Sequence, residues 1–309
     1  MKLSIVTTLY QSAPYIAEFH ERASAAARQL VGEDYEIVLV NDGSPDNSLE
    51  LAVQLIESDD HVIVVDLSRN FGHHKAMMTG LAHTQGDRVF LIDSDLEEYP
   101  EYLTSFAKQM ESEFCDVVYG VQENRKGGWF ERWSGQWFYR LFNVLTGLTL
   151  PANIVTARLM TRCYVDALLL HREREILIAG LWHITGFDQR PQSVKKHSSS
   201  ETTYSFHRKM SILVNAVTSF SNAPLVGIFY IGVSISLLAL VYIVFLVVQW
   251  IFFATPLSGW TSIMSSIWLI GGMIISFIGV VGIYLAKIFS ETKQRPYTIV
   301  RHIYAKQQA

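Results

Sequence analysis

The feature that most limits the fold of this chain is a long stretch without any charged side chain. Between Met210 and Ala286 there is no Asp, Glu, Lys, Arg or His. A backbone inside a bilayer must satisfy its own hydrogen bonds, so such a stretch predicts membrane helices. Two candidate spans, 225–252 and 262–289, each exceed the roughly 20 residues that a bilayer requires. Pro256 and Gly259 mark the turn between them.

Basic residues flank this predicted hairpin on one side only. Arg208 and Lys209 precede the first span, and the connecting segment has no basic residue. Five more lie at the end of the second span or after it: Lys287, Lys293, Arg295, Arg301 and Lys306. An excess of Lys and Arg marks the cytoplasmic side of a membrane protein, so both ends of the hairpin are expected in the cytoplasm. The formal net charge of −4 gives no indication of nucleic-acid binding.

The first 120 residues alternate strand and helix patterns. Apolar runs predict strands at 3–8, 36–41, 62–65, 89–92 and 117–119. Amphipathic patterns predict helices at 15–30, 45–57, 74–84 and 100–112. This alternation is typical of an α/β doubly wound domain around a parallel sheet.

Two carboxylates follow the predicted strand at 89–92. Asp93 and Asp95 stand at i and i+2 on an extended chain, so their side chains point the same way. Parallel sheets bind ligands beyond the carboxyl ends of their strands. Hard oxygen ligands suit Mg²⁺ or Mn²⁺, which take further ligands from phosphates. The sequence thus predicts a metal–diphosphate site, although D-x-D triplets are also common in surface loops.

The ends of two other predicted strands meet the same rim. Thr8 and Tyr10 follow the first strand and Asp42 follows the second, so a nucleotide lying across the rim could contact all of them. The Asp42 carboxylate can accept hydrogen bonds from the N–H groups of a base. An Asp in this place can equally be a helix cap. No P-loop and no G-x-G-x-x-G is present, which favours metal and basic side chains as the diphosphate ligands.

The order of these motifs resembles the polyprenyl-phosphate glycosyltransferases of glycosyltransferase family 2. That group includes dolichyl-phosphate mannose synthases and bacterial undecaprenyl-phosphate sugar transferases. The resemblance is carried by Thr8-Leu9-Tyr10, Val40 to Ser44, Arg69-Asn70-Phe71-Gly72, Asp93 to Glu101, the two spans and Lys293-Gln294-Arg295-Pro296. It implies a GT-A (nucleotide-sugar-binding, Rossmann-like) catalytic domain followed by interfacial helices and two transmembrane helices.

The activity implied by the resemblance is an inverting sugar transfer. The donor would be a nucleotide-diphosphate sugar, with UDP favoured, and the acceptor a polyprenyl phosphate such as undecaprenyl phosphate. The reaction would take place at the cytoplasmic face of the inner membrane, with the catalytic domain and the C-terminus in the cytoplasm. Its product would donate sugar to cell-envelope glycans such as the O-antigen of lipopolysaccharide. The relatives also suggest a homo-oligomer.

The resemblance assigns roles to individual residues. It implies nucleotide-sugar contacts for Thr8, Tyr10, Asp42, Asn70, Gly72, Asp93 and Arg125. The implied metal ligands are Asp93, Asp95 and Glu97. The implied catalytic residues are Asp93, Asp95 and Arg158. Contacts with the acceptor phosphate would come from Arg158 and Lys209.

The sequence departs from the family pattern in two places. Relatives usually read D-A-D-L-Q-D-P-P-E, so Glu97 replaces Gln and Glu98 replaces Asp. The segment 151–157 replaces an acidic and aromatic one before Arg158. These changes suggest a subgroup with its own donor sugar.

Four segments are expected along the chain: a nucleotide-sugar-binding core at 1–128, an acceptor-side segment at 129–224, the membrane hairpin at 225–289 and a cytoplasmic basic tail at 290–309. Aromatic residues at helical spacing with interleaved Arg predict an interfacial helix at 129–142.

Two alternatives to the transferase interpretation remain open. A processive polysaccharide synthase would carry Q-x-x-R-W, but Trp129 stands where Gln is required before Arg132 and Trp133. The other alternative is a catalytically inactive membrane scaffold, against which the intact Asp42, Asp93, Asp95 and Arg158 argue.

Overall fold

The computed structural model describes residues 2–122, 153–173, 178–195, 214, 217–218, 221–253 and 259–306. The chain divides into two compact units. Unit 1 comprises Met1–Tyr139, Thr149–Tyr204 and Arg295–Ala309, and unit 2 comprises Arg140–Leu148 and Ser205–Gln294. Each unit is described by itself.

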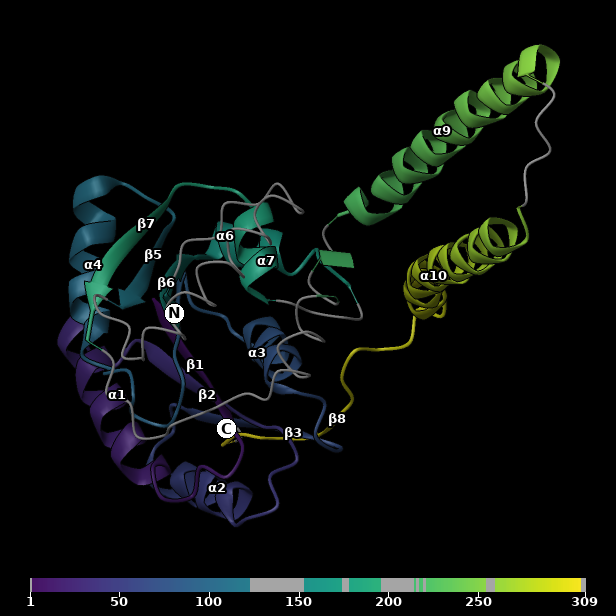
Figure 1. Cartoon of the computed structure of the whole chain (residues 1–309). Helices are drawn as coiled ribbons and strands as arrows, with labels where there is room; N and C mark the ends of the chain where they lie inside the picture. The colour runs from purple at the N-terminus through teal and green to yellow at the C-terminus, as the bar shows by residue number, and fades with distance from the viewer. Residues whose placement is uncertain are drawn as a thin grey trace. The chain divides into compact units, whose positions relative to one another are not determined.

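Unit 1 is built on a mixed sheet with eight strands within the described residues (Figure 1). The strands are β1 Leu3–Leu9, β2 Tyr35–Asn41, β3 Val62–Leu67, β4 Arg88–Leu91, β5 Val117–Gln122, β6 Ile154–Thr161, β7 Gln189–Val194 and β8 Val300–Tyr304. Their order across the sheet is β7-β5-β6-β4-β1-β2-β3-β8. The four strands β4, β1, β2 and β3 are parallel, as predicted. The sheet as a whole is mixed, because β6 lies antiparallel between β4 and β5, and β8 lies antiparallel to β3.

Helices cover both faces of this sheet. One face packs against α1 Ile16–Val31, α2 Ser48–Ser58 and α4 Tyr102–Glu113, whose apolar residues join the main core. The other face carries α3 His73–Ala82, α6 Arg162–Leu168 and α7 Ile178–Ile184. Helix α3 approaches the strands closely through Gly80, where a Cβ would lie 2.6 Å from Val6 and 2.8 Å from Val40. The later part of α3 is thereby packed against β1 and β2.

Most predicted elements of the first 120 residues lie within three residues of their observed bounds. Helix α2 begins at Ser48 rather than at Pro45, because the Asp46 carboxylate holds the preceding residues in a turn. Asp46 accepts hydrogen bonds from the Ser44 hydroxyl and from both the hydroxyl and the N–H of Ser48. These hydrogen bonds hold the pKa of Asp46 at about 2 even though burial opposes ionisation.

The predicted basic tail contributes a strand to the sheet. Residues 300–304 form β8, which pairs Tyr304 with Val64 and His302 with Asp66. Strands β7 and β8 therefore form the opposite edges of the sheet. Along the chain, most of unit 2 lies between these two edge strands.

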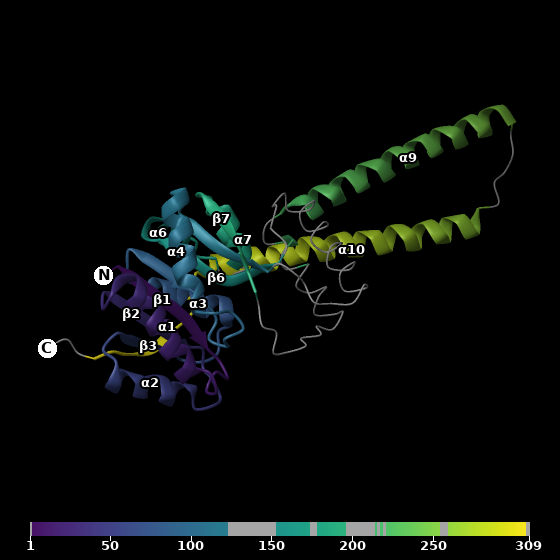
Figure 2. The ribbon, with the colours of Figure 1, turned by 90° about the vertical axis from the view of Figure 1, so that its left-hand side faces the viewer.

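Unit 2 contains two long helices, α9 Ala223–Phe253 and α10 Trp260–Thr292 (Figure 2). Among the described residues only one helical stretch, Ser266–Thr292, is long and apolar enough to cross a membrane. Several side chains of α9 lie outside the described residues, so the first span stays a prediction. The Tyr284 hydroxyl of α10 donates to the carbonyl of Ser221, two residues before α9, at 2.7 Å. The start of α9 and the later part of α10 therefore lie together. The predicted interfacial helix at 129–142 falls outside the described residues.

Candidate active site

The loop that carries Asp93 and Asp95 is tied to the end of β1. The N–H of Ile92 still donates to Val6, so the pairing of β4 with β1 reaches the residue before Asp93. Between the two aspartates, the buried Ser94 hydroxyl lies 3.0 Å from both the Thr8 carbonyl and the Ser12 hydroxyl. The two carboxylates therefore lie beside Thr8 at the rim, as the sequence predicts.

The carboxylate of Asp93 has polar contacts on both oxygens. The Thr156 hydroxyl donates to Asp93 Oδ2 at 2.7 Å, and His73 Nε2 lies 3.3 Å from Oδ1. The other His73 nitrogen, Nδ1, lies 2.9 Å from the Thr8 hydroxyl. Burial works against the charged imidazolium, but the hydrogen bond and charge of Asp93 raise the pKa of His73 above its ordinary value. Three elements, β1, α3 and β6, thus orient one carboxylate.

Asp42 joins the rim loop after β2 to the start of α3. Its side chain is buried and accepts hydrogen bonds from the N–H groups of Phe71 at 2.7 Å and Gly72 at 3.0 Å. Burial raises the pKa of Asp42, and these two hydrogen bonds limit the rise. The N-cap residues are Asn47 for α2 and Gly72 for α3, so Asp42 is not the helix cap that the sequence left open. Its contact with a base stays a prediction.

Gly43 explains why the two loops can pack so closely. Its φ is +58°, and a Cβ there would overlap the backbone of Arg69 and Asn70. The loops that follow β2 and β3 therefore form one surface beside Asp42.

The two departures from the family pattern contact each other. Glu98 is fully buried, and its carboxylate accepts hydrogen bonds from the N–H groups of Thr156 at 3.1 Å and Ala157 at 2.6 Å. Glu98 thus fixes the start of β6 beside the aspartate loop. The same β6 residue, Thr156, carries the hydroxyl that orients Asp93.

The residues at the rim fit a divalent cation that is bound together with a diphosphate. Asp95 accepts the N–H of Glu97 at 3.0 Å, across Leu96 with a φ of +58°, so one tight turn carries Asp93, Asp95 and Glu97. No three His, Cys, Asp or Glu side chains among the described residues converge as a metal cage. Mg²⁺ commonly binds through one or two carboxylates plus phosphates and water, which matches this donor set.

Arg158 lies away from the rim surface. Its side chain is 1% exposed, and its guanidinium lies 2.9 Å above the ring of Trp182. Burial lowers the pKa of Arg158 to about 9, while Tyr164 and Glu98 partly compensate. A phosphate does not reach Arg158 in this conformation, so its contact with the acceptor stays a prediction that requires the surrounding residues to open.

The remaining predicted site residues divide into two groups. Tyr10 and Asn70 are exposed beside the rim, while Arg125 and Lys209 fall outside the described residues. Sequence reasoning did not identify Thr156 or Glu98 as site residues, and for His73 it favoured a capping or solvent-exposed position over a contact with diphosphate. The only local signal for His73 was its position directly after the Asn70-Phe71-Gly72 turn, and nothing local marked Thr156.

A mixed α/β sheet of this order, with a D-x-D loop after β4, defines a GT-A glycosyltransferase fold. The sequence profile described as "Glycosyl transferase family 2" matches residues 4–169, more than half of the chain. The chain therefore belongs to glycosyltransferase family 2 and is a sugar-transferring enzyme of that family.

Relatives match nearly the whole chain. A Mycobacterium tuberculosis (strain CDC 1551 / Oshkosh) protein, whose name assigns it provisionally to the glycosyltransferases, is 53% identical over 98% of this chain and 89% of its own length. The bactoprenol glucosyl transferase of Shigella phage SfX is 29% identical over 97% of this chain and 99% of its own. The crystal structure of S. aureus TarS 1–349 in complex with UDP-GlcNAc is 18% identical, with a TM-score of 0.47, and covers 72% of this chain and 68% of that one.

Proposed function

We propose that this enzyme transfers a sugar from a nucleotide-diphosphate sugar, with UDP favoured, to a polyprenyl phosphate at the cytoplasmic face of the inner membrane. The observation that carries the proposal is the rim cluster, in which Asp93 and Asp95 lie beside Thr8, Asp42 and His73. The apolar helix Ser266–Thr292 supports a membrane location. The name of the phage relative, a bactoprenol glucosyl transferase, supports a lipid acceptor.

The chemistry of the acceptor explains why no general base is required. A sugar hydroxyl would need one, but a phosphate monoester has a second pKa near 6 and is largely dianionic at neutral pH. The nucleophile arrives already charged. The enzyme must instead bring two negative substrates together and stabilise the departing nucleoside diphosphate.

In this proposal Mg²⁺ or Mn²⁺ binds with the donor diphosphate at Asp93 and Asp95, with Glu97 as a third candidate ligand. When bound, the ion supplies a Lewis acid that neutralises charge on the leaving diphosphate. Thr156 and His73 hold the Asp93 carboxylate in one orientation, so this metal-binding side chain is ordered before the donor binds. The arrangement around Asp93 thus contributes preorganisation rather than proton transfer.

The test is a transfer assay on membranes that contain the enzyme. The membranes are incubated with a panel of radiolabelled UDP- and GDP-sugars, and lipids are extracted into an organic solvent. Label in a mild-acid-labile lipid, made from one donor only, would support the proposal and name the sugar.

Membranes carrying Asp93→Asn provide the matched control, because Asn keeps the size of the side chain but removes an anionic ligand. Label in a polymer that stays out of the organic phase would instead favour a processive polysaccharide synthase. Equal incorporation by wild type and Asp93→Asn would argue that the rim cluster is not catalytic. No incorporation from any donor would favour the inactive scaffold.

A further inference from the structure

We propose that Arg301, on the strand that follows the long apolar helix, is a positioning residue for the nucleotide of the donor. The inference rests on the proposed function, because it assumes that the nucleotide lies over the loops after β2 and β3. Arg301 itself touches neither loop tip. It acts through hydrogen-bonded residues that hold both loops.

The first link is an ion pair between β8 and β3. Arg301 Nη1 lies 3.4 Å from Asp66 Oδ2, and the Asp66 side chain is only 2% exposed, whereas that of Arg301 is 60% exposed. Within the described residues, Asp66 Oδ2 has no hydrogen-bond partner. A buried carboxylate needs a counter-charge, and Arg301 supplies it from the solvent side of the sheet edge.

Asp66 passes this support to the loop after β2. Its Oδ1 accepts the side-chain amide of Asn41 at 2.8 Å, and Asn41 Oδ1 accepts the N–H of Ser44 at 3.2 Å. The Ser44 hydroxyl in turn accepts the N–H of Gln11, in the loop after β1, at 2.7 Å. An unbroken polar chain therefore runs from the edge strand β8 to the rim loops after β2 and β1.

Arg301 also holds the loop after β3. Its Nη2 donates to the carbonyl of Ser68 at 2.7 Å, and the N–H of Ser68 donates to the carbonyl of Ile299 at 2.9 Å. Ser68 directly precedes the turn whose Phe71 and Gly72 amides bind Asp42. One guanidinium thus braces the two loops that Asp42 joins.

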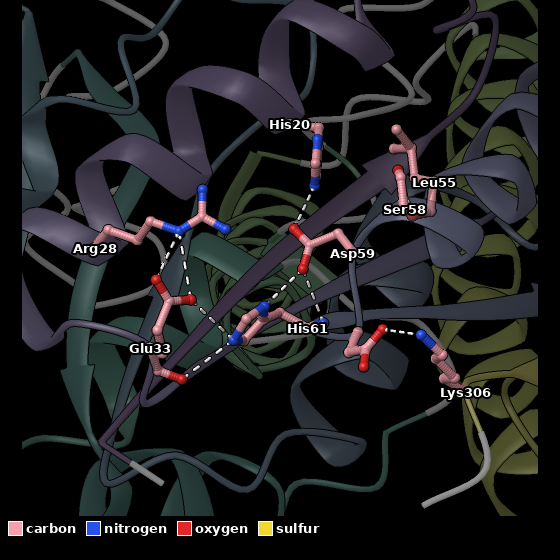
Figure 3. A network of polar contacts seen from close by, with 9 residues as sticks. His20, Arg28, Glu33, Leu55, Ser58, Asp59, His61 and Lys306 are labelled. Carbon is pink, nitrogen blue, oxygen red and sulfur yellow. Dashed lines mark hydrogen bonds and ion pairs between the residues drawn. The ribbon is translucent and has the colours of Figure 1, made fainter.

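The residues just after β8 offer a matched control. Lys306 Nζ lies 2.5 Å from Asp60 Oδ1, and both side chains are more than half exposed (Figure 3). Asp60 lies just before the start of β3, between Asp59 and His61 of the network in Figure 3, and so at the opposite end of β3 from the rim. Lys306 is also a basic residue of the C-terminal segment paired with an Asp, but within the part of the chain that the structure describes its ion pair is with Asp60 and not with a rim loop.

The experiment uses the full-length enzyme in lipid nanodiscs, with UDP and GDP as binding probes and the labelled transfer assay for kinetics. Whichever nucleotide wild type binds, we expect Arg301→Met to bind it about fivefold more weakly or worse. The donor KM should rise by about the same factor, and kcat should change less than twofold. Lys306→Met should leave both quantities unchanged. Arg301→Lys should rescue in part, because a single ammonium can pair with Asp66 but cannot hold the fork geometry that also reaches Ser68.

A second substitution separates positioning from general loss of stability. Asp66→Asn removes the charge that Arg301 balances but keeps an oxygen for the Asn41 amide. In the double variant Arg301→Met with Asp66→Asn, the donor KM should therefore recover toward that of Asp66→Asn alone. If Arg301 had a merely structural role, the decreases in melting temperature caused by the two substitutions would add, and the donor KM would not recover.

The inference would be overturned if Arg301→Met matched Lys306→Met in nucleotide affinity and donor KM, or if kcat fell while KM stayed constant. It would also be overturned if the double variant were worse than Arg301→Met. Failure of the proposed function would look different, because wild type itself would then bind neither UDP nor GDP and would label no lipid.

Discussion

Replacing Thr156 by Val tests whether the hydroxyl beside Asp93 matters for catalysis. Val has the shape of Thr and suits a strand, so the substitution removes the hydrogen bond to Asp93 Oδ2 with little change in packing. A hydrogen bond to a charged group contributes about 1.5–3 kcal/mol. If the transition state depends on the orientation of Asp93, loss of that energy should lower kcat/KM roughly 10- to 150-fold.

The assay compares wild type, Thr156→Val and Thr156→Ser by initial rates of lipid labelling, with thermal unfolding of each purified protein as the check on folding. Ser keeps the hydroxyl and loses only the methyl group, so it should retain most of the activity. The reasoning would be refuted if Val and Ser had the same activity, or if Val stayed within twofold of wild type at equal stability.

Three further predictions concern the metal, a buried cation and acid stability. Asp95→Asn should lower transfer at least ~100-fold, and a chelator should do the same to wild type, so full activity in excess EDTA would contradict a metal role. Arg158→Ala should lower unfolding stability by about 2–5 kcal/mol because it removes a large buried side chain that packs against Trp182. If denaturant titrations of Arg158→Ala showed unchanged stability while the transfer assay showed a raised KM for the acceptor, the result would instead support a contact between Arg158 and the acceptor phosphate. Burial opposes ionisation of Asp59, but hydrogen bonds from His61 and His20 lower its pKa below the ordinary 3.8 (Figure 3). The ionised Asp59 therefore stabilises the fold above pH 3.8, and this stabilisation is lost as the pH falls through the lowered pKa. The stability difference between wild type and Asp59→Asn should therefore shrink below pH ~4, and a difference that stayed constant down to pH 2 would rule out this cause.

The parallel half of the sheet was predictable because its strands carry their own signal. Strands β1, β2 and β4 are buried along nearly their whole length, so each is rich in apolar residues on both faces. Their carboxyl ends must share a rim, so the strand pattern by itself predicts that Thr8, Asp42 and Asp93 lie together.

The edge strands were not predictable from local pattern. β7 is mostly exposed and contains Pro191, and β8 lies in a basic segment with three exposed residues. What makes each of them a strand is pairing with β5 or β3, residues far away along the chain. β6 was not predicted, because Arg158 at its centre is typical of a surface position and not of a buried one.

The contacts of Asp93 depend on these unpredicted strands. Thr156 lies on β6, and its place beside Asp93 follows from the antiparallel pairing of Arg158 with Leu91 of β4. A D-x-D pattern can therefore locate the acidic loop but cannot show which hydroxyl or imidazole orients it.

The position of β8 has a consequence for the order in which the enzyme is made. During synthesis, β1 to β7 emerge first, then α9 and α10, and only then the residues that pair with β3. Until that last strand arrives, Asp66 lacks Arg301 and the loops after β2 and β3 lack their brace. A ribosome that stalls in the apolar helices would leave a catalytic domain with an open sheet edge. A soluble version of the enzyme must for the same reason keep residues 295–306, joined by a linker, rather than end before the first long helix.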